Sequence, residues 1–333
     1  MSHPFPALRL VTEGPERSRK VESVLELIGD TPLLEIRRLA EGLPPEVRIY
    51  AKLEGFNPGG SVKDRPALKM VQEGIKSGKL QRGKTIIDST SGNTGIALAM
   101  IGKVLGYPVE LVMPSNVSSE RKRVVAAFGA RVIFSDPLEG SDGAIRLCRK
   151  MIEQNPEKYF KPDQYFNPMN TRAHYETTGP EIYRQTRGEI THLIAGIGTG
   201  GTIMGAGRYL KEMNPAVRVI AVEPDDALHG LEGLKHMASS IVPGIYHEEE
   251  IDSKIPISTE NAYAMVYRLS QEEGILVGQS SGAAMYVTLQ MARKLRSGTL
   301  VTIFPDFGDR YLTTNLWVGW RDRMSVGNLK FSI

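Results

Sequence analysis

Lys63 lies in the stretch NPGGSVKDRPALKM, residues 57–70, where a loop is expected to enter a helix. Ser61 followed by Asp64 resembles a helix N-cap with its capping-box partner. A lysine in the first turn, however, faces the positive end of the helix dipole. A helix N-terminus would lower the pKa of this amine and favour the free base that attacks a carbonyl. A solvated surface lysine is the competing interpretation of this stretch alone.

A second polar turn follows a predicted strand that ends at Asp88. Its sequence, TSGNT, presents hydroxyls, an amide and backbone N–H groups at the start of a helix, which favours the binding of a carboxylate or phosphate. Helix capping accounts for one or two such residues, but not for five polar or glycine positions in a row. We therefore predict an anion site formed by Thr90, Ser91, Gly92, Asn93 and Thr94.

A third junction, GTGGT, joins a predicted strand to a predicted helix. Glycines allow the backbone to approach a phosphate closely, and the helix N-terminus supplies N–H donors. This is the strongest phosphate-binding pattern in the chain. Its residues are Gly198, Thr199, Gly200, Gly201 and Thr202.

The same glycines permit a second interpretation. Gly196, Gly198 and Gly201 satisfy the dinucleotide-binding pattern G-x-G-x-x-G, and Glu223 lies at the end of the next predicted strand, where a ribose-binding acid is expected. A nicotinamide-dependent dehydrogenase is therefore an alternative function. It would leave Lys63 and the TSGNT turn without a role.

The fourth junction contains Ser280 and Ser281, between a short apolar run and a predicted helix. Taken alone, a helix cap is the simplest interpretation. Taken with the other three junctions, it completes what pyridoxal phosphate requires: a lysine for the aldimine, a phosphate cradle, a partner for the ring nitrogen and a site for the amino-acid carboxylate. The four junctions supply one each.

Short β-branched runs alternate with helical patterns along the chain, which is typical of parallel α/β sheets with helices on both faces. The predicted strands span residues 47–52, 85–88, 109–113, 131–134, 192–197, 217–222 and 300–304. The predicted helices span residues 62–77, 94–105, 119–128, 144–154, 202–213 and 281–295. Since ligands in such folds bind at the carboxyl ends of strands, these elements position the four junctions.

Length and charge narrow the class of protein. A chain of 333 residues suggests two domains. The 41 Lys and Arg residues are balanced by 38 Asp and Glu residues without a basic block, so no nucleic-acid partner is expected. No metal site is predicted. The chain has 34 glycines, a fraction above the usual ~7%, and many of them fall at the four junctions.

Neither a membrane segment nor a targeting signal is predicted. The uncharged stretches 190–207 and 274–292 are interrupted by Gly, Ser, Thr and Gln. The N-terminus carries Arg9 and Glu13, which argues against a secretory or transit signal and favours a loose arm over residues 1–21. The single cysteine, Cys148, lies in a predicted helix and is expected to be a buried thiol, which suits a cytoplasmic protein.

The motifs GGSVKDR, TSGNTG, GTGGT and GQSSGA occur here in the same order as in the cysteine synthase and cystathionine β-synthase family of pyridoxal-phosphate enzymes, which the chain resembles over about residues 22 to 315. LIGDTPLL, QYFNPMN, HYETTGPEI and FGDRYLTT also match. The resemblance implies fold type II, with two α/β domains that are each an open, mostly parallel twisted sheet covered by helices on both faces. The expected smaller domain spans 57–167 and carries the substrate-carboxylate loop. The larger spans 22–56 plus 168–320 and carries the phosphate cradle, with a boundary in the Pro- and Asn-rich stretch 155–170.

The resemblance also implies roles for single residues. Lys63 would be the Schiff-base lysine and would move the proton at the substrate Cα, and Asn93 would bond the ring hydroxyl of the cofactor. Ser280 would face the pyridine nitrogen, and a neutral serine there suits β-elimination. The phosphate would be held by Gly198, Thr199, Gly200, Gly201 and Thr202, and the substrate carboxylate by Thr90, Ser91, Gly92, Thr94 and Gln164.

The implied reaction is a β-replacement through an α-aminoacrylate. An activated L-serine, O-acetylserine or O-phosphoserine, loses its β-substituent, and sulfide adds to give L-cysteine. Closure of the smaller domain would exclude water from the site. The family also implies a homodimer.

Two choices of substrate stay open. Homocysteine as acceptor, as in cystathionine β-synthase, is the alternative to sulfide, and the short stretch after Thr314 favours sulfide. Residues 225–246 resemble sulfhydrylases of the CysM type, some of which accept O-phosphoserine through a cation in this segment. Lys235 is the candidate cation, although a lysine lacks the fork of an arginine, and a solvated lysine is the competing interpretation.

Overall fold

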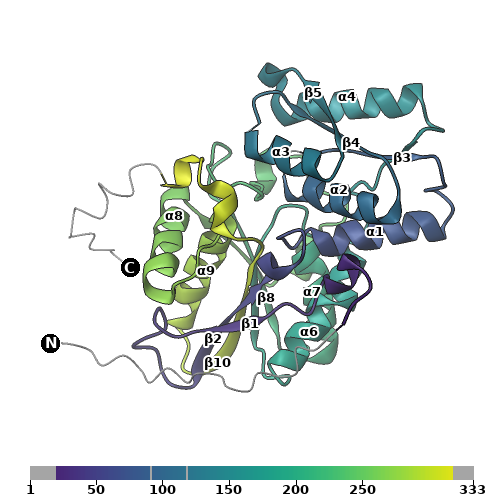
Figure 1. Cartoon of the computed structure of the whole chain (residues 1–333). Coiled ribbons are helices and arrows are strands. Elements are labelled where there is room, and N and C mark those ends of the chain that lie inside the picture. The colour runs from purple at the N-terminus through teal and green to yellow at the C-terminus, as the bar shows by residue number, and fades with distance from the viewer. Residues whose placement is uncertain (1–19, 91, 118, 318–333) are drawn as a thin grey trace.

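The computed structural model describes residues 20–90, 92–117 and 119–317, whose strands form two separate sheets (Figure 1). The six-stranded sheet has the order β1-β2-β10-β7-β8-β9, and the four-stranded sheet has the order β5-β4-β3-β6. All adjacent strands are parallel except β1 and β2. The predicted fold class is therefore confirmed.

The six-stranded sheet combines both ends of the described chain, because β10 lies between β2 and β7. Its inner strands are buried along most of their length, as expected where helices cover both faces. The six strands are β1 Leu33–Ile36, β2 Val47–Leu53, β7 His192–Gly196, β8 Arg218–Pro224, β9 Ser253–Ile257 and β10 Gly298–Phe304.

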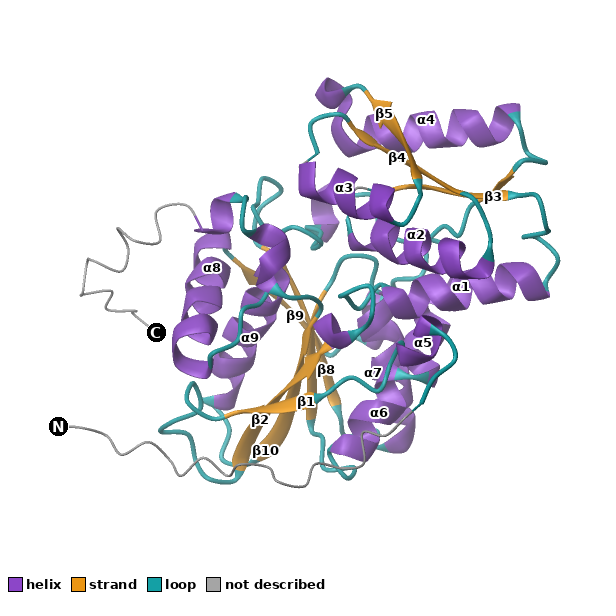
Figure 2. Ribbon diagram, in the orientation of Figure 1, coloured by secondary structure: helices purple, strands orange, loops and turns teal. Residues whose placement is uncertain are grey.

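Helices cover both faces of this sheet (Figure 2). The helices α6 (Thr178–Gln185) and α7 (Gly201–Met213) pack on one face, with α5 (Pro168–Glu176) against α7. On the other face, α8 (Thr259–Arg268) and α9 (Gln279–Ala292) bury apolar side chains against the strands.

The four-stranded sheet is a second α/β layer. Its strands are β3 Thr85–Ser89, β4 Val109–Pro114, β5 Arg131–Ser135 and β6 Tyr159–Phe160. One apolar core unites this sheet with α1 (Asp64–Lys76), α2 (Asn93–Leu105) and α3 (Ser119–Ala127). On the opposite face, α4 (Gly140–Gln154) buries Cys148, whose pKa burial raises to about 12, so the predicted buried thiol is confirmed.

The seven predicted strands and six predicted helices all form, with ends that differ by a few residues. The prediction missed β1, β6, β9, α5, α6 and α8. β6 has only two residues, and β9 contains Pro256, which lowers its strand signal. The sequences of α5 and α6 are mostly polar.

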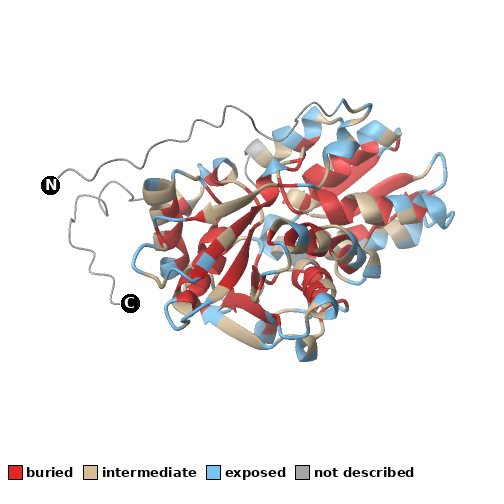
Figure 3. Ribbon diagram, turned by 90° about the horizontal axis from the view of Figure 1, so that it is seen from below, coloured by how far each residue is buried: buried red, intermediate tan, exposed pale blue. Residues whose placement is uncertain are grey.

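The chain leaves the larger sheet after β2, builds the smaller sheet from α1 to β6, and returns at α5. Buried residues concentrate on the strands and the inner faces of the helices (Figure 3). The domain limits at 57, 167 and 320 stay a prediction, and residues 1–19 of the expected arm lie outside the described residues. No helix among the described residues is long and apolar enough to cross a membrane.

Candidate active site

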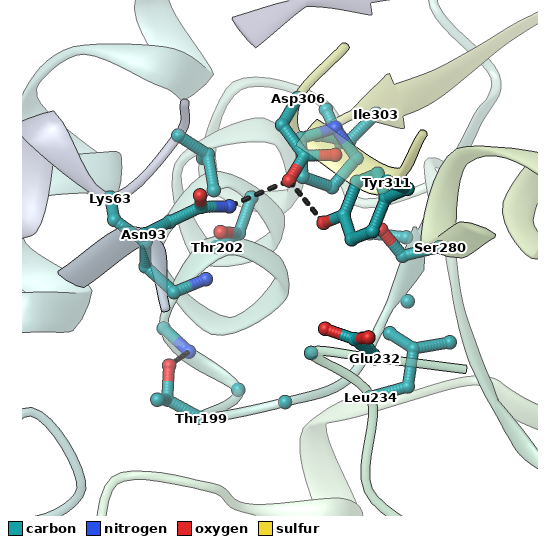
Figure 4. A pocket seen from close by; sticks show the side chains of 18 residues that line it. Lys63, Asn93, Thr199, Thr202, Glu232, Leu234, Ser280, Ile303, Asp306 and Tyr311 are labelled. Atoms are coloured by element: carbon teal, nitrogen blue, oxygen red, sulfur yellow. Dashed lines mark hydrogen bonds between the residues drawn. The ribbon is translucent and has the colours of Figure 1, made fainter. Parts of the chain in front are cut away.

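The structure brings Lys63, Asn93, the GTGGT turn and Ser280 together around one cavity, at the carboxyl ends of β7 and β10 (Figure 4). The four residues or turns come from the starts of α1, α2, α7 and α9. The cavity is lined by Val62, Lys63, Asn93, Ala195, Gly196, Gly198, Thr199, Gly200, Gly201, Thr202, Glu232, Gly233, Leu234, Ser280, Ile303, Pro305, Asp306 and Tyr311.

Lys63 is itself the N-cap of α1, and no side chain caps this helix. The predicted cap by Ser61 is therefore wrong. Ser61 forms a β-bridge with Asp306, so its backbone belongs to the preceding extended segment, and its hydroxyl accepts a hydrogen bond from the Lys63 N–H at 3.2 Å. The Asp64 carboxylate accepts from the Gly59 N–H instead of completing a capping box.

The Lys63 side chain opens onto the cavity, and among the described residues no carboxylate forms an ion pair with its amine. Burial lowers the pKa of Lys63, and the nearby Asp306 charge opposes this shift only in part. The surroundings therefore favour the neutral amine, which is the form that acts as a nucleophile or base.

The GTGGT turn has the geometry of an anion cradle. Gly200 has φ +84°, a left-handed conformation that favours glycine, and a Cβ at Gly198 would lie 2.2 Å from the Gly233 carbonyl oxygen. α7 begins at Gly201, and a helix start leaves its first N–H groups without helical partners. The backbone donors of this turn can therefore approach a phosphate without interference from side chains.

Asp306 and Tyr311 also line the cavity. Neither was predicted as a site residue, although Tyr311 lies in the motif FGDRYLTT. Asn93 Nδ2 and the Tyr311 hydroxyl both donate to Asp306 Oδ2, at 2.6 and 2.5 Å (Figure 4). The Arg310 guanidinium donates to Asn93 Oδ1. Asp306 follows the carboxyl end of β10, which is where α/β folds place ligands, and this strand end was the available signal.

Ser280 lies inside α9, one residue after the helix starts, and its side chain is buried at the cavity wall. Its interpretation as a helix cap is wrong, because the N-cap is Gly278 and no side chain caps α9. A larger residue does not fit at position 278, because a Cβ there would lie 2.2 Å from Asp306 Oδ1. Ser280 therefore presents a neutral hydroxyl to the cavity.

The described residues predicted to bind the substrate carboxylate are not among those that line the cavity, although Thr94 directly follows Asn93, which is. Thr94 donates to Gln164 Oε1 at 2.7 Å, so these two buried side chains are paired with each other. Thr90 accepts from the N–H of Gly92, which is the N-cap of α2. Ser91 lies outside the described residues.

Lys235 is not among the residues that line the cavity. Its amine lies 5.0 Å from the centre of the Tyr165 ring, and burial lowers its pKa. Glu232, on the same loop, does line the cavity and forms an ion pair with Arg121 of α3. The residue types in this segment pointed to Lys235, whereas Glu232 is the charged residue of the loop that lines the cavity.

Glu223 does not face the cavity. Its Oε2 accepts from the Met237 N–H at 3.0 Å, its Oε1 lies 3.5 Å from Lys254 Nζ, and the residue is buried. The carboxylate therefore holds a loop and is not free for a ribose, as a dinucleotide-binding acid would be.

A buried cluster of charges anchors the turn that carries Lys63. Arg65 pairs with Glu54 and Glu181, each at 2.7 Å, and Lys52 pairs with Glu181 at 2.7 Å. Burial opposes ionisation of Glu181, but the Arg65 and Lys52 charges outweigh it and lower its pKa to about 2. The cluster joins α1 to β2 and α6, so it fixes the start of α1 against the larger sheet.

Asp88 precedes the TSGNT turn and is buried, with Oδ1 bonded to the Ser89 N–H and Oδ2 without a hydrogen-bond partner in the part of the chain that the structure describes. Burial raises its pKa to about 6. Because the folded-state pKa lies above the unfolded value of about 3.9, the folded state binds more protons between the two values. Ionised Asp88 therefore destabilises the fold above pH 6, and this penalty disappears as the pH falls toward 4.

Asp88→Asn is expected to raise the free energy of unfolding of the apoprotein by about 2–3 kcal/mol at pH 8, and by much less at pH 5. Urea unfolding at both pH values measures this difference. Asp225→Asn, at an exposed carboxylate, serves as the control. An equal effect of Asp88→Asn at the two pH values would contradict the assigned shift.

The cavity fits pyridoxal phosphate on structural grounds. It combines an unpaired lysine with a lowered pKa, a glycine turn at a helix start, an amide at Asn93 and a neutral hydroxyl at Ser280. Among the described residues, no group of three or more His, Cys, Asp or Glu side chains could hold a metal ion.

Comparisons with known proteins agree with this chemistry. The family model described as "Pyridoxal-phosphate dependent enzyme" matches residues 24–306. A cysteine synthase of Aquifex aeolicus is 54% identical over 311 residues, which cover 92% of this chain and 95% of that protein. The structure of O-acetylserine sulfhydrylase isoform 3 from Entamoeba histolytica is 41% identical, with a TM-score of 0.88 and coverage of 92% and 94%. The structure of an O-acetylserine dependent cystathionine β-synthase from Helicobacter pylori is 38% identical, with a TM-score of 0.84 and coverage of 90% and 100%.

Proposed function

We propose that Lys63 is the catalytic residue of this chain, which belongs to the family of pyridoxal-phosphate dependent enzymes. The reaction forms L-cysteine from an activated L-serine and sulfide. The observation that supports this role most directly is the meeting of Lys63 and the GTGGT turn at one cavity. A lysine that must bond a cofactor and a turn that must hold its phosphate are required to share a site.

Bound pyridoxal phosphate supplies an aldehyde for amines and an electron sink for the charge left at Cα when a proton is removed. The protein holds this group through the backbone donors of the GTGGT turn, the Asn93 amide and the Ser280 hydroxyl. Lys63 Nζ then takes the proton from the substrate Cα, the acetate or phosphate leaves from Cβ, and Lys63 returns a proton to Cα after sulfide has bonded to Cβ. Its lowered pKa supports the neutral amine that the first step needs.

We place the substrate carboxylate at the TSGNT turn, with Thr90, Ser91, Gly92, Thr94 and Gln164. The hydrogen bond between Thr94 and Gln164 supports this placement, because it holds both side chains at the start of α2. A carboxylate at this helix N-terminus would gain backbone donors and a favourable dipole.

O-acetylserine is the proposed donor, and O-phosphoserine is the alternative. The cavity side of the Lys235 loop carries the Glu232 carboxylate, whose ion pair with Arg121 would have to open before Arg121 could bind a phosphate dianion. Lys235 itself lies over the Tyr165 ring with a lowered pKa, which weakens it as a phosphate partner.

Lys235→Ala is expected to change kcat/KM by less than about threefold for both donors, because the amine makes no contact that discriminates between them. Initial rates with O-acetylserine and O-phosphoserine in the same preparation measure this, each donor serving as the control for the other. A loss above about tenfold for O-phosphoserine alone would assign Lys235 to its phosphate.

The acceptor is tested by assaying sulfide and homocysteine in parallel with one donor. We expect a higher kcat/KM with sulfide, in line with the curated relatives named cysteine synthase. The structural similarity to an O-acetylserine dependent cystathionine β-synthase makes homocysteine the relevant competitor. A higher kcat/KM with homocysteine would reverse the assignment.

A homodimer and a cytoplasmic location complete the proposal. The resemblance to the cysteine synthase family supports the dimer, which sedimentation velocity would measure. The single, buried cysteine supports a reducing compartment, because the chain has no second cysteine for an internal disulfide.

A further inference from the structure

Helix α5 lies directly behind the GTGGT turn. Two glycines of α7 allow this contact: a Cβ at Gly201 would lie 2.0 Å from Asn170 Oδ1, and a Cβ at Gly205 would lie 2.2 Å from the Thr171 carbonyl oxygen. Side chains of α5 therefore reach the two threonine hydroxyls of the turn.

The Thr199 hydroxyl is held as an acceptor by its protein neighbours. Asn170 Nδ2 donates to Thr199 Oγ1 at 3.1 Å, and the Gly201 N–H donates to it at 3.3 Å. The same Asn170 nitrogen also donates to the Gln164 carbonyl, which fixes the orientation of the amide. Since Thr199 accepts two hydrogen bonds, its own hydrogen is left for the cavity that it lines.

His174 acts in the same way on Thr202. The His174 side chain is buried, with Nδ1 2.9 Å from Thr178 Oγ1 and Nε2 3.3 Å from Thr202 Oγ1. Burial lowers the pKa of His174 to about 3, so the ring is neutral near pH 7 and carries one N–H.

The buried Thr178 hydroxyl decides which nitrogen carries the proton. Thr178 is fully buried, and among the described residues its side chain has no hydrogen-bond partner other than His174. A buried hydroxyl hydrogen needs an acceptor, so Thr178 donates to Nδ1 and the proton lies on Nε2. His174 then donates to Thr202, whose hydroxyl hydrogen is left for the cavity.

We infer that Asn170 and His174 are positioning residues that turn the hydroxyls of Thr199 and Thr202 into donors toward the phosphate of pyridoxal phosphate. Two hydroxyls that can only donate suit a fully ionised phosphate, which only accepts hydrogen bonds. The inference rests on the proposed binding of the phosphate at the GTGGT turn.

The test measures binding of pyridoxal phosphate to the apoprotein, by titration, for His174→Phe, Thr202→Val and the double variant. We expect each single variant to raise Kd about tenfold or more, because a hydrogen bond to a charged group is lost or misdirected. In the Thr202→Val background, His174→Phe is expected to have little further effect. The 31P resonance of the bound cofactor should shift in both single variants.

Controls separate a positioning role from a structural one. His192→Phe changes a partly buried histidine that also contacts a threonine hydroxyl, Thr191, but does not line the cavity, and its Kd should match the wild type. His174→Gln should recover most of the affinity, because its amide nitrogen can replace Nε2 as the donor. Thermal melts of the apoproteins show whether each variant is folded.

The outcomes are distinguishable. If Thr202→Val leaves Kd unchanged, the proposed place of the phosphate is wrong. If Thr202→Val weakens binding while His174→Phe does not, or if His174→Phe weakens binding equally in both backgrounds, the role of His174 is overturned and the phosphate site stands.

Discussion

Lys63→Ala is expected to lower kcat/KM for cysteine formation by about a thousandfold or more, the largest effect of any single substitution in this chain. The variant loses both the amine that bonds the cofactor and the base that moves the proton at Cα. Alanine leaves the cavity otherwise intact, because Lys63 has no ion-pair partner among the described residues. Sulfide-dependent cysteine formation under saturating pyridoxal phosphate measures the loss.

Lys69→Ala provides the matched control. Lys69 is on the same helix, and its partly exposed amine pairs with Glu176 at the surface. Its removal should leave kcat/KM within about twofold and stability nearly unchanged. If Lys63→Ala kept more than about a tenth of the wild-type activity while Lys69→Ala behaved normally, the assignment of Lys63 would fail.

Arg65→Met is expected to lower the free energy of unfolding of the apoprotein by about 3–5 kcal/mol. Methionine keeps most of the apolar volume but leaves Glu54 without its main partner and Glu181 with Lys52 as its one charged partner among the described residues. Both carboxylates are buried, so neither can be rehydrated without opening the fold. Urea unfolding of the apoprotein measures the change.

Arg184→Met is the control for this effect. Arg184 makes an ion pair with Asp30, and both side chains are well exposed, so the same substitution should cost less than about 1 kcal/mol. Adding Glu54→Gln to Arg65→Met should recover part of the loss, because it removes the carboxylate that has lost its partner while Glu181 keeps its ion pair with Lys52. An Arg65→Met variant as stable as Arg184→Met would refute the anchoring role of the cluster.

The architecture was predictable where the hydrophobic pattern is strong. β4 is an almost wholly apolar run, β3 has an apolar centre at Ile86 and Ile87, and α2 follows the polar TSGNT turn, so hydrophobic pattern and turn residues defined them. β9 was not predictable, because Pro256 interrupts its pattern and its place in the sheet comes from pairing with β8. Local sequence carries little information on such long-range pairing.

The site was predictable where its functional residues are consecutive in the sequence. Lys63 stands out because a cation is unfavourable in the first turn of a helix. GTGGT stands out because it places three glycines between a strand and a helix. Asp306 and His174 do not, since a single acid after a strand and a histidine in a helix have many ordinary explanations. Their significance lies in contacts with Asn93 and Thr202, which come from distant parts of the chain.

The position of β10 has a consequence for how the protein is made. The smaller sheet is complete once β6 has been synthesised, but β10 separates β2 from β7 and is the last of the described strands to be made. Until it emerges from the ribosome, the larger sheet lacks a central strand, and two apolar strands have open edges that can pair with other chains. Asp306 and Tyr311 directly follow β10. Catalytic competence and protection from aggregation are therefore reached together, once β10 and the residues after it have been made.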